Sequence, residues 1–176
     1  SALASGDSTA GAAGNVTIMA GRDIFSGYLY YGAGVLSYSS ARSERGTAQS
    51  SNGGNIIFSA GHNVLADDET ITDDVSLQSF SSSTSRLGES LAGNGGDISV
   101  SAETGSIRLT NRFYENRGLS DDFSRQTEIL SFSVADGDFS GDGGNVTLRA
   151  SDTIQDLEIL TLSSSAQSGE IRIYGL

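Results

Sequence analysis

The chain has 176 residues, a hydrophobic fraction of 36% and no proline, cysteine or tryptophan. Its ten basic residues are all arginine, and its 22 acidic residues give a formal net charge of −12. Such a charge excludes the basic surface that nucleic-acid binding needs. The missing cysteine and lysine exclude thiolate and Schiff-base chemistry. No stretch approaches the roughly 18 apolar residues of a membrane-spanning helix, so no transmembrane segment is expected.

A short motif occurs five times along the chain, each time directly after glycine. It reads NVTIMA from Asn15, NIIFSA from Asn55, DISVSA from Asp97, NVTLRA from Asn145 and EIRIYGL from Glu170. Consecutive copies begin 40, 42, 48 and 25 residues apart. A repeat on this scale is typical of stacked architectures, in which each unit covers the apolar face of its neighbour.

Apolar and polar residues alternate strictly inside each copy, which predicts a strand with one buried face. The alanine that ends four of the copies indicates a corner where the chain bends. The polar residue that begins each copy predicts a ladder of hydrogen-bonded side chains between stacked units. We expect Asp97 and Glu170 to interrupt that ladder of asparagines.

The predicted fold is all-β: a right-handed parallel β-helix, or β-solenoid, of about four to five coils with three strands in each coil. Residues 1–176 form a single segment, which we expect to be excised from a longer array. The longer repeats predict flank insertions near 25–50, 66–92 and 111–128. Serine runs such as Ser81-Ser82-Ser83 are expected on solvated corners.

Two copies of the repeat carry an extended glycine motif. It stands as GNGGD at 93–97, continuing to Ala102, and as GDGGN at 141–145, continuing to Ala150. This pattern resembles the repeats of filamentous-haemagglutinin-type exoproteins of the two-partner secretion route, especially the cyanobacterial kind. The resemblance implies a β-helix that is secreted or held at the cell surface in association with the outer membrane, where it serves as an adhesin or stalk.

An acidic turn is the sharpest candidate for a metal site. Asp136, Asp138, Ser140 and Asp142 alternate with other residues, two of them glycines. Alternating oxygen ligands on a tight turn can wrap a calcium ion. Thr147 occupies the position where a complete EF-hand loop has its bidentate glutamate. The alternative is a solvated acidic turn, and no other cofactor is predicted.

Aromatic residues gather in the first and third predicted insertions. Their faces can stack on sugar rings beside polar groups, and the alternative is that they pack the insertions onto the flank. The predicted ligand-binding residues are Tyr28, Tyr30, Tyr31, Arg112, Phe113 and Tyr114. The predicted partner is a surface glycan or a protein receptor.

The expected function is a non-enzymatic adhesin or structural stalk that presents these loops and self-associates along the solenoid axis. One alternative is a polysaccharide-degrading β-helix enzyme, a lyase or a tailspike-type hydrolase. It would use paired carboxylates, but adjacent acids such as Asp67-Asp68 and Asp73-Asp74 point to opposite sides of a strand. A second alternative is a calcium-dependent surface assembly module.

Overall fold

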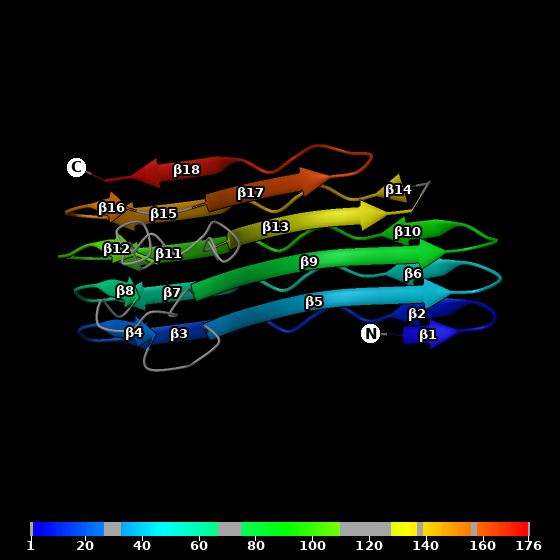
Figure 1. Cartoon of the computed structure of the whole chain (residues 1–176), viewed down its shortest axis with the longest axis horizontal. Coiled ribbons are helices and arrows are strands. Elements are labelled where there is room, and N and C mark those ends of the chain that lie inside the picture. The colour runs from blue at the N-terminus through cyan, green and yellow to red at the C-terminus, as the bar shows by residue number, and fades with distance from the viewer. Residues whose placement is uncertain are drawn as a thin grey trace, which may run out of the picture.

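The structure is a computed structural model that describes residues 2–26, 33–66, 75–109, 128–136, 139–155 and 158–175. Within these ranges the chain forms β-strands and no helix. All strand pairs are parallel, and they assemble into four sheets (Figure 1). The predicted all-β class is therefore confirmed.

Each strand of sheet B directly follows a strand of sheet A along the chain. Sheet A has the order β1-β5-β9-β13-β17, with bounds Ala2–Ala4, Ala33–Ser43, Val75–Ser85, Glu128–Ala135 and Glu158–Ser163. Sheet B has the order β14-β10-β6-β2, with bounds Phe139–Ser140, Ser90–Ala92, Ala48–Ser50 and Ser8–Ala10.

Sheet C and sheet D hold the strands of the repeated motif and of the segment after it. Sheet C has the order β18-β15-β11-β7-β3, with bounds Ile171–Tyr174, Val146–Ala150, Ile98–Ala102, Ile56–Ala60 and Val16–Ala20. Sheet D has the order β16-β12-β8-β4, with bounds Ile154–Gln155, Ile107–Arg108, Val64–Ala66 and Ile24–Ser26.

Four times in succession the chain visits sheets A, B, C and D in this order, and we call one such passage a rung. A fifth, shorter rung goes from β17 in sheet A to β18 in sheet C without a sheet B strand. Each new strand pairs with the strand of the preceding rung, so the predicted in-register columns are confirmed: Val16, Ile56, Ile98, Val146 and Ile171 are partners in turn. A rung has four strands rather than the predicted three, because the segment after the alanine corner forms its own short strand in sheet D.

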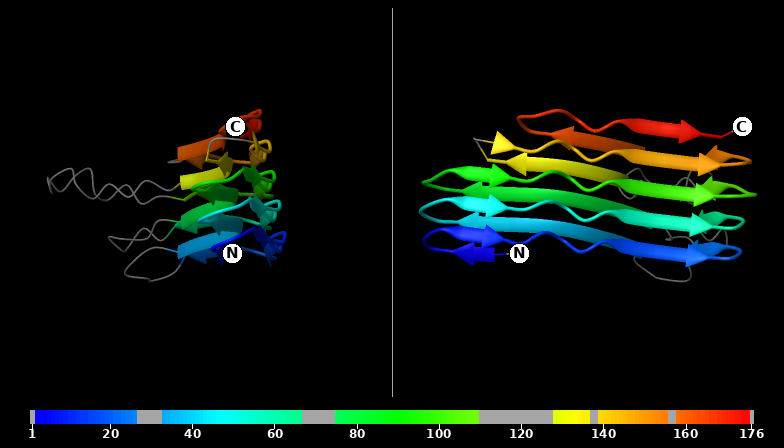
Figure 2. Two further views of the ribbon diagram at one scale, coloured as in Figure 1. Left: turned by 90° about the vertical axis from the view of Figure 1, so that its right-hand side faces the viewer. Right: turned by 180° about the vertical axis from the view of Figure 1, so that it is seen from behind.

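Sheets A, B and C make two layers. Sheets B and C run end to end behind sheet A, as the view from behind shows (Figure 2). Ala60, Ala102 and Ala150 end the sheet C strands, are buried, and are each followed by a bend that leads into sheet D. The predicted bend at the alanine is thus confirmed.

One half of the interior, between sheet C, sheet D and the beginning of the sheet A strands, is aliphatic. Large side chains there are fully buried and pack in one cluster. The largest of them are Ile56, Leu77, Ile98, Ile107, Leu109, Ile129, Leu148, Val64, Val100 and Val146. This cluster is the hydrophobic core of the protein.

The other half of the interior, between the ends of the sheet A strands and sheet B, is filled mainly with hydroxyl groups. Ser39, Ser81 and Ser83, expected on solvated corners, are at most 1% exposed. For these serines the expectation was wrong, because the strand continues through the serine runs and alternate serines point inward. In the run after β17, Ser164 and Ser165 are exposed as expected. Buried hydroxyl residues are Ser8, Ser37, Ser39, Ser43, Ser50, Ser79, Ser81, Ser83, Ser85, Ser90, Ser131, Ser133, Ser140 and Thr161.

The predicted insertions are shorter than their ranges suggested. The range 25–50 contains β5 and β6, and the range 66–92 contains β9 and β10, all of which are paired strands. The later parts of these long strands, from Ser37 and Ser79 onward, carry no large apolar residue on their inner face, so this stretch of the sequence does not show the usual strand pattern. Segments 27–32, 67–74 and 110–127 lie outside the described residues, and each precedes a sheet A strand.

Candidate binding surfaces

The residues predicted to bind a glycan or receptor lie outside the described residues. These are Tyr28, Tyr30, Tyr31, Arg112, Phe113 and Tyr114. The same is true of Asp138 in the predicted calcium turn and of the acidic pairs Asp67-Asp68 and Asp73-Asp74. Those proposals stand as predictions from the sequence.

Three described members of the acidic turn face in different directions. The buried Ser140 hydroxyl lies 2.8 Å from that of Ser163 and 3.0 Å from that of Ser165. Asp142 is exposed, and its Oδ1 accepts a 3.2 Å hydrogen bond from the backbone of Gln167. Asp136 is exposed as well. Strand β14 ends at Ser140, so Asp142 lies beyond the strand and faces solvent while Ser140 is buried.

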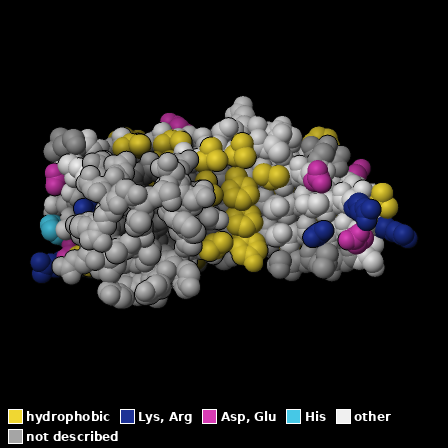
Figure 3. Space-filling model, viewed as in Figure 1, with side chains coloured by type: hydrophobic (Ala, Val, Ile, Leu, Met, Phe, Trp, Pro, Cys, Tyr) yellow, Lys and Arg dark blue, Asp and Glu magenta, His cyan; other side chains and the backbone are white. Residues whose placement is uncertain are grey.

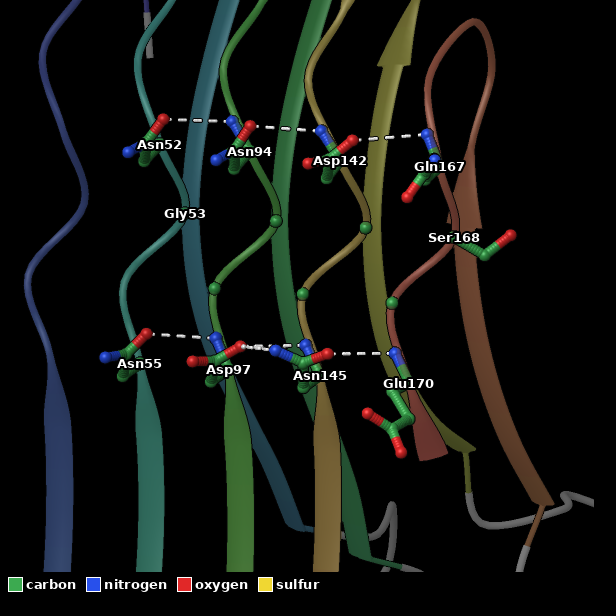
Figure 4. Close-up of a pocket in the computed structure, with 15 residues that line it drawn as sticks. Asn52, Gly53, Asn55, Asn94, Asp97, Asp142, Asn145, Gln167, Ser168 and Glu170 are labelled. Carbon is green, nitrogen blue, oxygen red and sulfur yellow. Dashed lines mark hydrogen bonds between the residues drawn. The ribbon is translucent and has the colours of Figure 1, made fainter. Parts of the chain in front are cut away.

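Two parallel ladders of polar side chains run across the rungs between sheets B and C (Figure 4). In each ladder a side-chain oxygen accepts a hydrogen bond from the backbone N–H of the next rung, over 2.8 to 3.2 Å. The first ladder is the predicted one, Asn15, Asn55, Asp97, Asn145 and Glu170. The second is Asn52, Asn94, Asp142 and Gln167.

Asp97 continues the first ladder, contrary to expectation. Its Oδ1 accepts from both the backbone and the side-chain nitrogen of Asn145, at 2.8 and 3.2 Å. A carboxylate accepts as well as an amide oxygen does, so the acceptor role survives the replacement. Glu170 contributes only its backbone N–H to the described ladder. The carboxylate of Glu170 instead pairs with Arg172, whose hydrogen bond lowers the pKa of the glutamate.

A groove of about 500 Å³ lies between the two ladders, with a floor of glycine pairs. The glycine backbone at the bottom of the groove lies close to sheet A, because serines of sheet A donate hydrogen bonds to it. Ser79 donates to the Gly54 carbonyl at 2.6 Å, and Ser131 donates to that of Gly96 at 2.7 Å. A Cβ on Gly96 would overlap the Gly54 carbonyl and the Ser79 hydroxyl. Close approach of the neighbouring rung and of the opposite layer, rather than a left-handed backbone, thus requires glycine here.

The outer face of sheet A carries a band of apolar side chains (Figure 3). Tyr38, Phe80 and Phe132 are register partners on successive strands, and their rings stack with centroids 4.9 and 4.6 Å apart. We call this band the apolar face: it comprises Leu36, Tyr38, Phe80, Leu130, Phe132, Leu160 and Leu162. The signal in the sequence was an apolar residue flanked by serines, but Tyr38 and Phe80 fall in the ranges 25–50 and 66–92, which were predicted as insertions rather than strands.

The one histidine of the chain lies at the corner between sheets C and D. His62 Nδ1 is 2.9 Å from Asp23 Oδ1, which also accepts from the backbone and side chain of Asn63. Partial desolvation raises the pKa of Asp23, but the hydrogen bonds from His62 and Asn63 outweigh it and hold the pKa below its ordinary value. The pair links two rungs, and His62 itself is exposed at this corner.

Comparison with protein-family models, with curated proteins and with solved structures finds no match to the chain. The described residues include no helix with the length and apolar character needed to cross a bilayer. Within the same ranges, no three His, Cys, Asp or Glu side chains gather closely enough to hold a metal ion.

Proposed function

We propose that this protein is a right-handed parallel β-helix that serves, without enzymatic activity, as an adhesive or structural segment outside the cell or at its surface. The observation that carries the proposal is that four successive rungs visit the same four parallel sheets in the same order. Each rung pairs with its neighbours through backbone ladders and side-chain ladders together. Such a stack is stiff along its axis and presents the same position of every rung on one flank.

The right-handed sense of the β-helix is supported by a general rule and by one observation. Crossovers between parallel strands of one sheet are right-handed in about 98% of cases. In Figure 1 the chain runs rightward along sheet A in front and returns behind it as it rises from the N-terminal rung. An experimental structure that resolves the backbone decides the hand directly.

The adhesive role rests on the place of the predicted insertions in the chain. Segments 27–32, 67–74 and 110–127 all lie between a sheet D strand and the following sheet A strand. The stack therefore presents their attachment points on one flank. Several weak contacts that repeat along a flank gain strength together, as multivalent binding does. This supports insertions, rather than a single deep pocket, as the binding element.

A glycan array probed with the labelled chain tests this role, followed by incubation of every bound polysaccharide with the protein. We expect binding without release of shorter products. Tyr31→Ala and Tyr114→Ala should weaken it, whereas Tyr174→Ala, a tyrosine 54% exposed on sheet C, should not. Release of shorter saccharides would overturn the proposal in favour of the enzyme. Binding that all three variants leave unchanged would remove the insertions as the binding element.

The cellular location needs a separate measurement. Antibodies raised against the chain should label intact source cells or their culture medium. Labelling that appears only after the cells are permeabilised would contradict an extracellular role, whatever the glycan array shows.

A further inference from the structure

The outer face of sheet A is more apolar than the inner face directly behind it. From residue 36 onward, β5 points Leu36 and Tyr38 outward at 51% and 44% exposure, while Ser37 and Ser39 are buried. The same inversion occurs in β13, where Phe132 lies between the buried Ser131 and Ser133. The hydrophobic core does not account for these outward residues, so another surface must cover them if their apolar area is to leave water.

Packing within the apolar face restricts what can cover it. The rings of Tyr38, Phe80 and Phe132 are nearly parallel, with interplanar angles of 10° and 4°. Their flat faces are therefore turned toward one another, and mainly their edges are left to meet a partner. A sugar ring stacks on the flat face of an aromatic ring. Stacked rings beside leucines instead present the kind of broad apolar surface that another sheet covers.

The arrangement of residues about β9 makes the face complementary to itself. The register aligns Tyr38, Phe80 and Phe132 in one column, and Leu36, Gln78 and Leu130 in the next. A two-fold axis along β9 exchanges β5 with β13. It would place aromatic against aromatic and leucine against leucine.

The charged residues at the border of the face follow the same symmetry. Arg42 is the register partner of Thr84, and Asp136 directly follows Ala135, the partner of Ser83. Both Arg42 and Asp136 are exposed. The exchange of β5 with β13 therefore sets a cation against an anion, twice in each pair of molecules.

We propose that the apolar face is a homodimer interface, in which two copies of this chain pack sheet A against sheet A about a two-fold axis along β9. The sheets would lie about 10 Å apart, as packed sheets do. Tyr38 would face the partner's Phe132, and Arg42 would face the partner's Asp136. The net charge of −12 does not prevent this contact. The strand positions between the border charges hold only uncharged residues: Leu36, Tyr38, Ser40, Gln78, Phe80, Ser82, Leu130, Phe132 and Val134.

Sedimentation velocity over a concentration series of the purified chain tests the dimer. We expect a reversible monomer–dimer equilibrium, which Phe80→Ser weakens by about tenfold or more, since aromatic residues at the centre of an interface carry much of its affinity. Phe139→Ser is the matched control, because Phe139 is 72% exposed on sheet B and lies off the apolar face. A monomer at every concentration, or equal loss in both variants, would overturn the proposal.

Two sets of variants test the position of the axis without disturbing the core. Arg42→Asp and Asp136→Arg should each weaken the dimer several-fold, and the double variant should recover it. Because the chain has no cysteine, Ser82→Cys places a single thiol on β9 opposite its own copy, where a short thiol-reactive bismaleimide should cross-link the dimer. Ser40→Cys, on β5, should face Val134 and stay unlinked. Failure of the double variant to recover the dimer, or preferential linkage through position 40, would refute a two-fold axis along β9.

Discussion

The two halves of the interior fill the space between the layers with different kinds of side chain. In the aliphatic half, Ile56, Ile98 and Val146 stack in one column and are at most 1% exposed. In the serine half, Ser79 and Ser131 occupy equivalent positions on adjacent strands and bond to the glycine backbone of the opposite layer. The first half removes apolar area from water. The second satisfies buried polar groups, which would otherwise destabilise the fold.

This difference shows what determines the thickness of the molecule along a rung. Isoleucine and leucine hold the two layers apart, whereas a serine hydroxyl reaches a carbonyl only when the opposite backbone comes very close. Glycine permits that approach, since a Cβ on Gly95 would come within 2.8 Å of the Ser131 hydroxyl. Serine in one layer and glycine pairs in the other are therefore two parts of one contact.

The largest expected effect distinguishes inward from outward residues of the aliphatic half. Ile56 is 0% exposed and its neighbour Ile57 is 40% exposed on the same strand. Ile56→Ala should lower the free energy of unfolding by about 2–5 kcal/mol, because it removes buried methyl groups and leaves a cavity. Ile57→Ala should cost less than about 1 kcal/mol. Urea unfolding followed by circular dichroism measures both, and equal losses would contradict the assigned side of the strand.

A somewhat smaller loss is expected where the serine half depends on glycine. Gly96→Ala should cost about 1–3 kcal/mol, because its Cβ would meet the Gly54 carbonyl of the neighbouring rung and the Ser79 hydroxyl of the opposite layer. Gly14→Ala is the control, as Gly14 stands one rung from Gly54 and has open space where the Cβ would go. The same unfolding experiment applies. If Gly96→Ala is as stable as Gly14→Ala, the layers do not approach as described.

Hydrogen bonding in the serine half should contribute less for each residue. Ser79 donates to the Gly54 carbonyl at 2.6 Å and accepts from the Gly96 N–H at 3.0 Å. Ser79→Ala leaves both backbone groups without that partner and should cost about 1–2 kcal/mol. Ser82→Ala, on the outward side of the same strand, should change stability by less than about 0.5 kcal/mol. A neutral Ser79→Ala would mean that packing alone holds this half together.

These halves also show how far the sequence can be interpreted. The sheet C strands were predictable because isoleucine and valine alternate with polar residues, and their register followed from the repeat. Strands such as Val75–Ser85 were not, because serine on the inner face and phenylalanine on the outer face reverse the usual pattern. The apolar face was missed for the same reason. The first ladder was predicted from Asn15 and its equivalents, but the second was missed although Asn94 and Asp142 stand in the extended glycine motif.

Acid should act at the corners rather than in either half of the interior. The buried side chains among the described residues include serine and threonine but no ionisable group. Asp23 has a folded-state pKa below its ordinary value of 3.8, so the unfolded chain binds a proton more readily. Its contribution to stability is therefore present above pH 3.8 and is lost as the pH falls through the folded-state value. The difference between the urea midpoints measured above and below pH 3.8 should be smaller in Asp23→Asn than in the unchanged chain. If Asp23→Asn loses as much stability in acid as the unchanged chain, groups other than Asp23 cause the acid sensitivity.

Calcium should have the smallest effect, because the serine half competes for one of the predicted ligands. Ser140 is held by Ser163 and Ser165 inside the fold, so coordination would require it to leave that network. We therefore expect millimolar calcium to shift the melting temperature little relative to chelator. A ligand that binds only the folded state must raise that temperature. A clear rise that Asp136→Ala abolishes and Ser140→Ala preserves would show that the aspartates bind calcium without the serine. A rise lost in both variants would show that the serine network opens to bind it.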